Sequence, residues 1–441
     1  MNQLAEKLNA VLDSTCVGGL LSNYGRRMYV PKGIIVQSAE AKKQASRFNA
    51  TIGVALEEGS AMCLSSIKDF FSPSLKVGEI FPYAPMGGVP ALRSLWKERM
   101  FEKNPSMAGA CISIPVVAAG LTNALSLVCS LFLDEGDSVV LPNMYWENYD
   151  LILDEQRQAK KVLFDNFSFS KEGVAGFNVS GLDAALASTG DKAVVILNFP
   201  NNPTGYTPTN EEALEIVEVL KRYSNSGKKL VVVTDDAYFG LFFEEDVCKE
   251  SLFARLCNCS ENLLAVKCDA ATKEEMVWGF RVAFITYGSK GFTEEQYDAL
   301  VQKTMGALRG TLSCCSTSAQ NILVKGMTDP SYYKEKSDAV GKIKLRYDAL
   351  KASLSKYEER KDLIPLPFNS GYFMSFECSC NADELRHLLL DKYGTGVIRL
   401  DDHHIRLAFS SVDLKDIPSL VDTVYSASAE LKWKNSRLPV S

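Results

Sequence analysis

Histidine is scarce in this chain of 441 residues, and several catalytic patterns are missing. The three histidines, His387, His403 and His404, all lie near the C-terminus. None of the twelve cysteines forms a C-x₂-C pair, so the usual ligand spacing of a zinc site is absent and we expect no metal. No G-x-S-x-G turn is present, which disfavours a serine hydrolase with a nucleophile elbow.

Long apolar runs and an excess of positive charge are also lacking. The longest apolar stretch, residues 123–133, is too short to cross a bilayer, and the first residues lack the apolar core of a secretory signal. The net charge of −6 gives no reason to expect nucleic-acid binding. We therefore expect a cytoplasmic protein with reduced thiols that binds neither membrane nor nucleic acid.

Short apolar runs alternate with longer amphipathic segments from about residue 110 to residue 290. The runs are rich in β-branched residues and occupy residues 112–120, 138–142, 160–164, 193–199, 229–235, 263–267 and 281–287. This alternation predicts an α/β fold with a mixed, mostly parallel sheet covered by helices. From about residue 330 onward, long charged helical segments and a few strands predict a smaller α+β domain. We predict a large domain over residues 66–325 and a small domain formed by residues 1–65 and 326–441.

Polar side chains follow three successive predicted strands. Asparagines follow the strand at 193–199, Asp235 and Tyr238 follow the next, and Lys273 follows the third. In open α/β sheets, ligands bind beyond the carboxyl ends of the strands. These groups could hold and tune a planar, anionic ring that carries an aldehyde.

The order and spacing of three motifs resemble the fold-type I pyridoxal-phosphate enzymes, specifically class I/II aminotransferases related to the aspartate and aromatic enzymes. The motifs are N-P-T-G at 202–205, D-x-A-Y at 235–238, and a lysine eight residues before the arginine of G-F-R at 279–281. The resemblance extends from about Ile52 to Phe409. It implies pyridoxal 5′-phosphate as the cofactor.

The resemblance assigns the central residues to the cofactor ring. Lys273 would bind the aldehyde carbon and later move the substrate's α-proton, and Asp235 would face the pyridine nitrogen. Asn202 and Tyr238 would contact the phenolic oxygen. The chain departs from the family's usual S-x-S-K, because residues 270–273 read Ala-Ala-Thr-Lys and keep only the hydroxyl of Thr272.

The phosphate of the cofactor requires donors and positive charge. Gly120, Leu121 and Thr122 lie between a predicted strand and helix, where backbone N–H groups and a helix N-terminus can bind an anion. Arg281 supplies a planar cation suited to two hydrogen bonds with phosphate.

Two aromatic residues complete the cofactor contacts that the resemblance implies. Trp146 would stack on the ring, and Tyr83 would reach the phosphate of a neighbouring subunit, which makes the predicted active unit a homodimer. Tyr149 replaces a histidine that the resemblance places there in aspartate-type relatives. The sequence therefore leaves open which group supports the carboxylate of Asp235.

For the substrate, the resemblance points to both ends of the chain. Gly53 and Ala55 lie in the early strand that approaches the substrate, and Arg406 matches the arginine that binds the α-carboxylate. Arg309 lies where aspartate-type relatives read a side-chain carboxylate, although Cys314-Cys315-Ser316 replaces their Asn-Pro-Pro.

The resulting expectation is ping-pong transamination between an L-amino acid, either aspartate, glutamate or an aromatic one, and a 2-oxo acid such as 2-oxoglutarate. A lyase or decarboxylase on the same scaffold is the alternative, because the shared residues serve the cofactor rather than the type of reaction. A transcription regulator with an aminotransferase-like domain is disfavoured, since the fifty or so residues before the first family strand lack a basic helix-turn-helix pattern.

Overall fold

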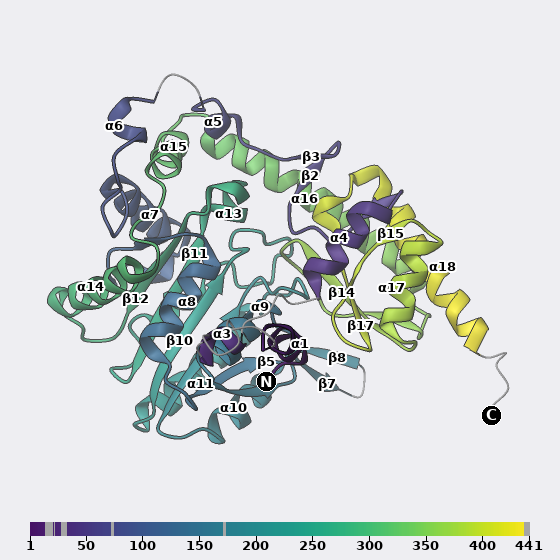
Figure 1. Ribbon diagram of the computed structural model, residues 1–441, viewed down its shortest axis with the longest axis horizontal. Helices are drawn as coiled ribbons and strands as arrows, with labels where there is room; N and C mark the ends of the chain where they lie inside the picture. Colours follow the sequence, from purple (N-terminus) through teal and green to yellow (C-terminus); the bar gives the residue numbers. More distant parts are fainter. Residues whose placement is uncertain (14–20, 22, 28–32, 72–74, 171–172, 436–441) are drawn as a thin grey trace.

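The computed structural model describes residues 1–13, 21, 23–27, 33–71, 75–170 and 173–435 (Figure 1). A seven-stranded sheet lies at its centre. In spatial order its strands are β4 (Val116–Ala118), β12 (Ala283–Gly288), β11 (Leu263–Ala270), β10 (Lys229–Asp236), β9 (Lys192–Asn198), β5 (Ser138–Pro142) and β6 (Lys160–Phe164).

The five strands from β11 to β6 are parallel, and β12 is antiparallel to both of its neighbours. The mixed, mostly parallel sheet is therefore confirmed. In register, Asp235 of β10 lies beside Asn198 of β9 and Cys268 of β11. The carboxyl ends of these three strands consequently meet at one edge of the sheet, where the polar residues were expected.

Helices cover the central sheet, because its strands are apolar on both sides. α8 (Leu121–Phe132) packs on β11 and β12 and also contacts α14 (Glu294–Thr311). α12 (Leu252–Leu256) also contacts β11, and contacts with other strands come from α10 (Val179–Ala187) and α11 (Asn210–Asn225). The start of α11 is fixed by a reciprocal pair of hydrogen bonds between Thr209 and Glu212, each joining a side chain to the other residue's backbone N–H.

A second, four-stranded antiparallel sheet confirms the smaller α+β unit. Its strands, in spatial order, are β13 (Leu363–Pro365), β14 (Phe373–Cys378), β17 (His404–Ala408) and β16 (Ile398–Arg399). Helices α17 (Ala382–Asp391) and α18 (Ile417–Asn435) accompany it. The long helix α16 (Tyr332–Leu354) runs from the neighbourhood of α5 (Ser65–Lys68) to α18 (Figure 1).

The N-terminal part of the chain joins this smaller unit. β1 (Phe48–Asn49) pairs in parallel with β15 (Thr395–Gly396), and α4 (Ile34–Gln44) packs on β15 and β16. In Figure 1 the purple α4 accordingly lies among the yellow-green C-terminal elements. These contacts support a small domain built from both ends of the chain, although the boundaries at 65/66 and 325/326 stay a prediction.

The remaining elements are shorter or peripheral. Those with regular helical or strand geometry are α1 (Gln3–Leu12), α3 (Asn23–Arg27), α6 (Val77–Ile80), α7 (Pro90–Lys103), α9 (Asn148–Asp150), α13 (Ala271–Glu274), α15 (Thr317–Met327), β2 (Leu56–Glu57), β3 (Ser60–Ala61), β7 (Phe167–Ser170) and β8 (Gly173–Phe177). In the described part of the chain, no helix has the length and apolar character needed to cross a membrane.

Candidate active site

A cavity of about 630 Å³ lies at the carboxyl ends of the central strands. Most of the predicted cofactor residues line it, namely Leu121, Thr122, Trp146, Asn202, Asp235, Tyr238, Thr272, Lys273 and Arg281. Asn198 and Ala237 also contribute, and we had given neither of them a role. Asn198 donates to the backbone oxygen of Asp235 over 2.8 Å and accepts from the N–H of Asn202 over 2.8 Å. Asn198 therefore links two of the predicted residues by hydrogen bonds. Its position at the end of a predicted strand is the sequence signal that could have identified it.

Lys273 lies in α13, directly after β11, with its Nζ 4.8 Å from the centre of the Tyr238 ring. Burial lowers the pKa of the Lys273 ammonium to about 8, with a further lowering from Arg281, while Asp235 opposes the change. A larger share of the amine is consequently neutral near physiological pH than for an exposed lysine. A neutral amine is what attack on an aldehyde requires.

Asp235 is buried on the face of β10 that lines the cavity. Its carboxylate accepts from the hydroxyl of Tyr149 over 2.5 Å and from the N–H of Ala237 over 3.1 Å. Burial raises the pKa of Asp235 to about 6, and both hydrogen bonds oppose that rise. Tyr149 thus provides the support that the sequence left open in the absence of the histidine.

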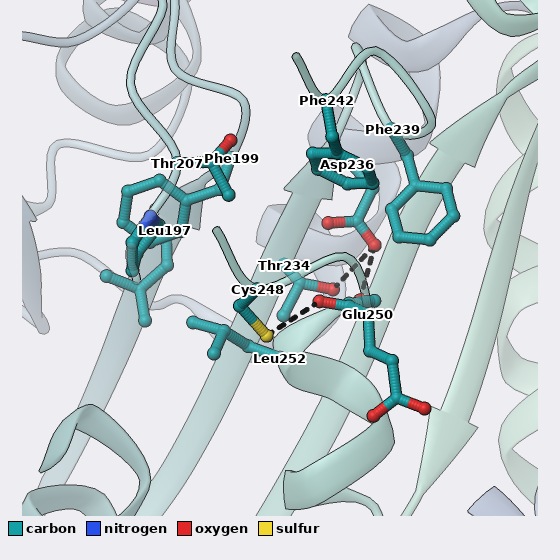
Figure 2. Close-up of a pocket in the computed structure, with 12 residues that line it drawn as sticks. Leu197, Phe199, Thr207, Thr234, Asp236, Phe239, Phe242, Cys248, Glu250 and Leu252 are labelled. Atoms are coloured by element: carbon teal, nitrogen blue, oxygen red, sulfur yellow. Dashed lines mark hydrogen bonds between the residues drawn. The ribbon is translucent and has the colours of Figure 1, made fainter. Parts of the chain in front are cut away.

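The neighbouring Asp236 lies on the opposite face of β10, because successive strand residues point to opposite sides. It accepts from the hydroxyl of Ser251 over 2.6 Å and pairs with the buried Lys267. Figure 2 shows Asp236 near Thr234 and Cys248 in a separate, smaller pocket. Of the two adjacent aspartates, only Asp235 lines the cavity with Lys273.

Gly120 and the guanidinium of Arg281 lie in close contact at the start of α8. Gly120 has a φ of +83°, and a Cβ added there would lie 2.1 Å from an Nη atom of Arg281. Glycine is therefore required both by the backbone conformation and by the close approach of the guanidinium. Gly120 also precedes α8, whose first residues Leu121 and Thr122 line the cavity.

The hydroxyl of Thr272 supports the fit of a phosphate at this site, because it is buried with no hydrogen-bond partner among the described residues. An unpaired buried hydroxyl is costly unless a ligand uses it. With the guanidinium of Arg281 and the start of α8, the donor set suits a phosphate group. Asp235, Tyr238 and Trp146 line the same cavity, so the residues present fit pyridoxal 5′-phosphate.

Arg406 lies beside this cavity with its guanidinium buried. It donates to the Oδ1 of Asn202 over 2.9 Å and to the backbone oxygen of Thr51 over 3.1 Å. Its Nε is buried without a partner in the described structure, and burial lowers the pKa of the guanidinium to about 10. Arg406 thus retains an unused donor of the kind that a carboxylate accepts from.

The expected early strand is wrong for Gly53 and Ala55, because both residues lie in the loop between β1 and β2. A Cβ on Gly53 would lie 3.7 Å from the hydroxyl oxygen of Tyr238, so the backbone at this position approaches the site. Ala55 is fully buried and does not line the cavity.

Tyr83 and Arg309 are not brought to the cavity within one chain. The side chain of Tyr83 is 91% exposed. Arg309 lies exposed in the last turn of α14 and donates to the hydroxyl of Ser313 over 2.6 Å. Any contact of these residues with an active site therefore depends on a second copy of the chain.

A larger cavity of about 1000 Å³ adjoins the first and shares Trp146 and Asn202 with it. Glu147, which our sequence reasoning did not single out, lines this cavity. Its carboxylate accepts from the N–H of Ile34 over 3.0 Å at the start of α4. The second cavity thus lies between the loop that bears Trp146 and the start of α4.

The chain is similar to known proteins in both sequence and fold. A family model described as aminotransferase class I and II matches residues 54–424. A probable aspartate/prephenate aminotransferase of Aquifex aeolicus is 27% identical over 262 residues, which cover 58% of this chain and 60% of the relative. An aspartate aminotransferase of Geobacillus stearothermophilus is 27% identical over 212 residues, covering 47% and 49% of the two chains. The chain thus spans about half to three fifths of the length of these curated relatives.

Solved structures show the same fold. An aminotransferase from Anaerococcus prevotii superposes with a TM-score of 0.80 at 24% identity, covering 90% of this chain and 97% of the other. A multiple substrate aminotransferase from Thermococcus profundus gives a TM-score of 0.77 at 15% identity, with coverages of 95% and 100%. Because the family model covers most of the chain, the protein belongs to the class I and II aminotransferase family.

Proposed function

We propose that this protein is a pyridoxal-phosphate-dependent aminotransferase that moves an amino group between an L-amino acid and a 2-oxo acid. The observation that carries the proposal is one cavity in which Lys273, Asp235 and Arg281 converge, with Arg406 at its side. Family membership supports it. The two substrates would bind in turn at the same site, which predicts ping-pong kinetics.

The residues that would hold the cofactor divide by the part they face. Arg281, Thr272 and the start of α8 would bind the phosphate. Asp235 would pair with the ring nitrogen, Tyr238 and Asn202 would contact the phenolic oxygen, and Trp146 would stack on the ring. When bound, pyridoxal phosphate supplies an aldehyde that takes up the amino group and a ring that stabilises negative charge at the α-carbon.

Within this arrangement, the chain's own groups bind the substrate and move a proton. Arg406 would hold the α-carboxylate by its guanidinium and thereby fix the orientation of the α-carbon. Lys273 would remove the proton from that carbon, because its lowered pKa makes the neutral amine available as a base.

For substrates we propose aspartate, glutamate or an aromatic amino acid, with 2-oxoglutarate as an acceptor. The names of the relatives, which include aspartate and prephenate, support this range. The larger cavity beside Trp146 offers room for a side chain of aromatic size. Arg309 would read a side-chain carboxylate from across a subunit interface.

A homodimer in the cytoplasm is the proposed form of the enzyme, with composite active sites. Phe81 and Met86, which lie close to Tyr83 in the sequence, are large apolar side chains that are exposed, and such exposure is typical of surfaces that contact another protein. Pairing through this surface would place Tyr83 at the site of the second subunit.

The test combines a spectrum with a variant. Purified protein should absorb visible light through bound cofactor, and incubation with an amino acid alone should yield one equivalent of 2-oxo acid without continued turnover. Lys273→Ala should abolish transamination while some cofactor is still retained through the phosphate site. Full activity in this variant would overturn the proposal, and steady release of ammonia or carbon dioxide would instead favour the lyase or decarboxylase.

A further inference from the structure

The larger of the two adjoining cavities is placed to receive the side chain of a substrate. This cavity of about 1000 Å³ shares Trp146 and Asn202 with the cofactor cavity. Asn202 accepts from the guanidinium of Arg406, the proposed carboxylate-binding residue, over 2.9 Å. A substrate whose α-carboxylate lies on Arg406 would therefore be bound beside the wall that the two cavities share, and its side chain can extend into the larger one.

Glu147 lies in the wall of this cavity, directly after Trp146, and the backbone at the start of α4 holds its carboxylate. One carboxylate oxygen accepts from the N–H of Ile34 over 3.0 Å. A Cβ added to Gly33 would lie 1.9 Å and 2.3 Å from the two carboxylate oxygens, so the lack of a side chain at Gly33 makes room for the carboxylate. Because Gly33 and Ile34 line the cavity as well, the carboxylate of Glu147 lies at its surface.

Glu147 differs from the other carboxylates that line the cavity in its charge partners. Asp150 pairs with Lys161 over 2.5 Å, and the imidazole of His404 lies 2.9 Å from Asp401. Among the residues that the structure describes, no lysine, arginine or histidine nitrogen lies within 4.0 Å of the Glu147 carboxylate. Glu147 thus contributes a negative charge that no side chain of the described chain neutralises at close range.

Arg399, a cation that also lines the cavity, is already paired. It forms an ion pair with Asp402 over 2.6 Å. Arg406 is influenced by Glu147 only through space: burial lowers the pKa of its guanidinium, and Tyr238 and then Glu147 oppose this change. A half-buried carboxylate without a close cation favours a ligand that brings a positive charge and a hydrogen-bond donor.

We propose that the larger cavity takes the side chain of an amino acid that ends in an ammonium group, as in lysine or ornithine, and that Glu147 selects this group by a charge-assisted hydrogen bond. The inference rests on the proposed function of Lys273 and Arg406, and it extends the substrate range to basic amino acids. Glu147 would repel a side-chain carboxylate in this cavity, so an acidic substrate would have to be bound by another group, as proposed for Arg309.

The test compares amino acids of similar length that differ at the end of the side chain. The cofactor-loaded enzyme is given L-lysine, L-norleucine or L-2-aminoadipate with 2-oxoglutarate as the acceptor, and kcat/KM is measured for each. Lysine should exceed norleucine at least tenfold, and Glu147→Gln should lower this ratio roughly tenfold while kcat/KM for norleucine changes less than twofold. Equal or better use of norleucine or 2-aminoadipate by the parent enzyme would overturn the inference, as would an unchanged ratio in Glu147→Gln.

A matched control lies in the wall of the same cavity. Asp150→Asn also removes a carboxylate, but its partner Lys161 keeps a second ion pair with Asp154 over 2.7 Å. The ratio of lysine to norleucine should therefore stay within twofold of the parent value, and an equal loss in both variants would contradict selection by Glu147. If Glu147→Gln does not fold, Gly33→Ala decides in its place, because the added methyl group would displace the carboxylate and should lower the ratio.

A binding measurement separates this inference from the proposed function. Calorimetry on cofactor-loaded Lys273→Ala protein measures affinity without turnover, and lysine should bind at least tenfold more tightly than norleucine. If the parent enzyme turns over no amino acid, the proposed function fails. If it turns over tyrosine or aspartate but the Lys273→Ala protein binds lysine no better than norleucine, the role of Glu147 alone is wrong.

Discussion

At the scale of single residues, Tyr149 supports the buried carboxyl of Asp235, at a position where the family resemblance implied a histidine. Its hydroxyl donates to Asp235 over 2.5 Å and opposes the rise in the pKa of this buried carboxyl. A histidine could carry a positive charge, whereas Tyr149 offers only a dipole. The charge state of Asp235 therefore depends on neutral hydrogen bonds from Tyr149 and Ala237 and on the charge of Lys273.

Tyr149→Phe should raise the pKa of Asp235 above its present value of about 6, because the hydroxyl that stabilises the carboxylate is removed. We expect the acidic limb of the pH profile of kcat to move to higher pH by about one unit. Activity near pH 8.5 should be reduced far less than activity near pH 6.5. An identical profile in the variant and the parent would show that Tyr149 does not tune Asp235.

Gly120→Ala should cost cofactor affinity rather than stability alone, because the new methyl group would displace Arg281. Gly136 provides the control, since its φ of +82° is nearly the same but no atom lies within 4 Å of an added Cβ. Both variants should lose about 1 kcal/mol or more of stability through backbone strain. Only Gly120→Ala should weaken cofactor binding by tenfold or more in a fluorescence titration, and equal affinities would contradict the close approach.

Arg309→Ala tests whether Arg309 binds the side-chain carboxylate of the substrate. If Arg309 acts across a dimer, KM for aspartate should rise at least tenfold while KM for an aromatic substrate changes little. Because Arg309 is exposed in the single chain, we expect its replacement to leave the stability unchanged, which thermal unfolding would check. Equal changes in KM for both substrates would show that Arg309 does not select for a side-chain carboxylate.

At the scale of elements, α13 shows where sequence patterns stop being informative. Lys273-Glu274-Glu275 has the composition of a solvated turn, yet both glutamates are buried. Their partners Lys103 and Lys336 are separated from them by 171 and 62 residues, respectively. No local pattern reveals such distant pairing, whereas the strand-end positions of Asp235 and Asn202 were predictable because apolar runs mark where strands end.

The ion pairs of Glu274 with Lys103 and Lys336 should make stability depend on pH in the acid range. The pKa of Glu274 is lowered in the folded protein, so its pairing stabilises the fold above the unfolded value near 4.5, and this contribution is lost as the pH falls toward about 2. Between pH 5 and pH 3 the free energy of unfolding should fall, by roughly 1–2 kcal/mol from this group. Glu274→Gln should show a shallower fall in urea unfolding, and an unchanged slope would remove Glu274 as a cause.

At the scale of the whole molecule, the sequence predicted the fold of the single chain in more detail than the association of subunits. The alternation of apolar and amphipathic segments indicated the mostly parallel sheet, and the charged C-terminal helices indicated the α+β unit. The antiparallel direction of β12 was not evident, because a buried strand has the same composition in either direction. The roles of Tyr83 and Arg309 stay predictions, since a single chain places both on its surface.

A mixing experiment addresses the proposed dimer. Lys273→Ala subunits should be inactive, and Arg309→Ala subunits should be only weakly active with aspartate. Unfolding and refolding them together should form mixed dimers in which one of the two sites has both residues intact. We expect activity with aspartate to recover to about a quarter of the parent value, with dimers seen in sedimentation. A fully active monomer, or no recovery in confirmed mixed dimers, would contradict composite sites.

The pairing of β1 with β15 sets an order for events during protein synthesis. Phe48 has its strand partner at Thr395, so the N-terminal segment leaves the ribosome long before its partner exists. At roughly 5–20 residues per second, the delay is about 20 to 70 seconds. The strands of the central sheet, which lie between these two segments, can be completed during that interval. The smaller unit is then assembled last, and the N-terminal segment is exposed to chaperones and proteases until the C-terminal part arrives.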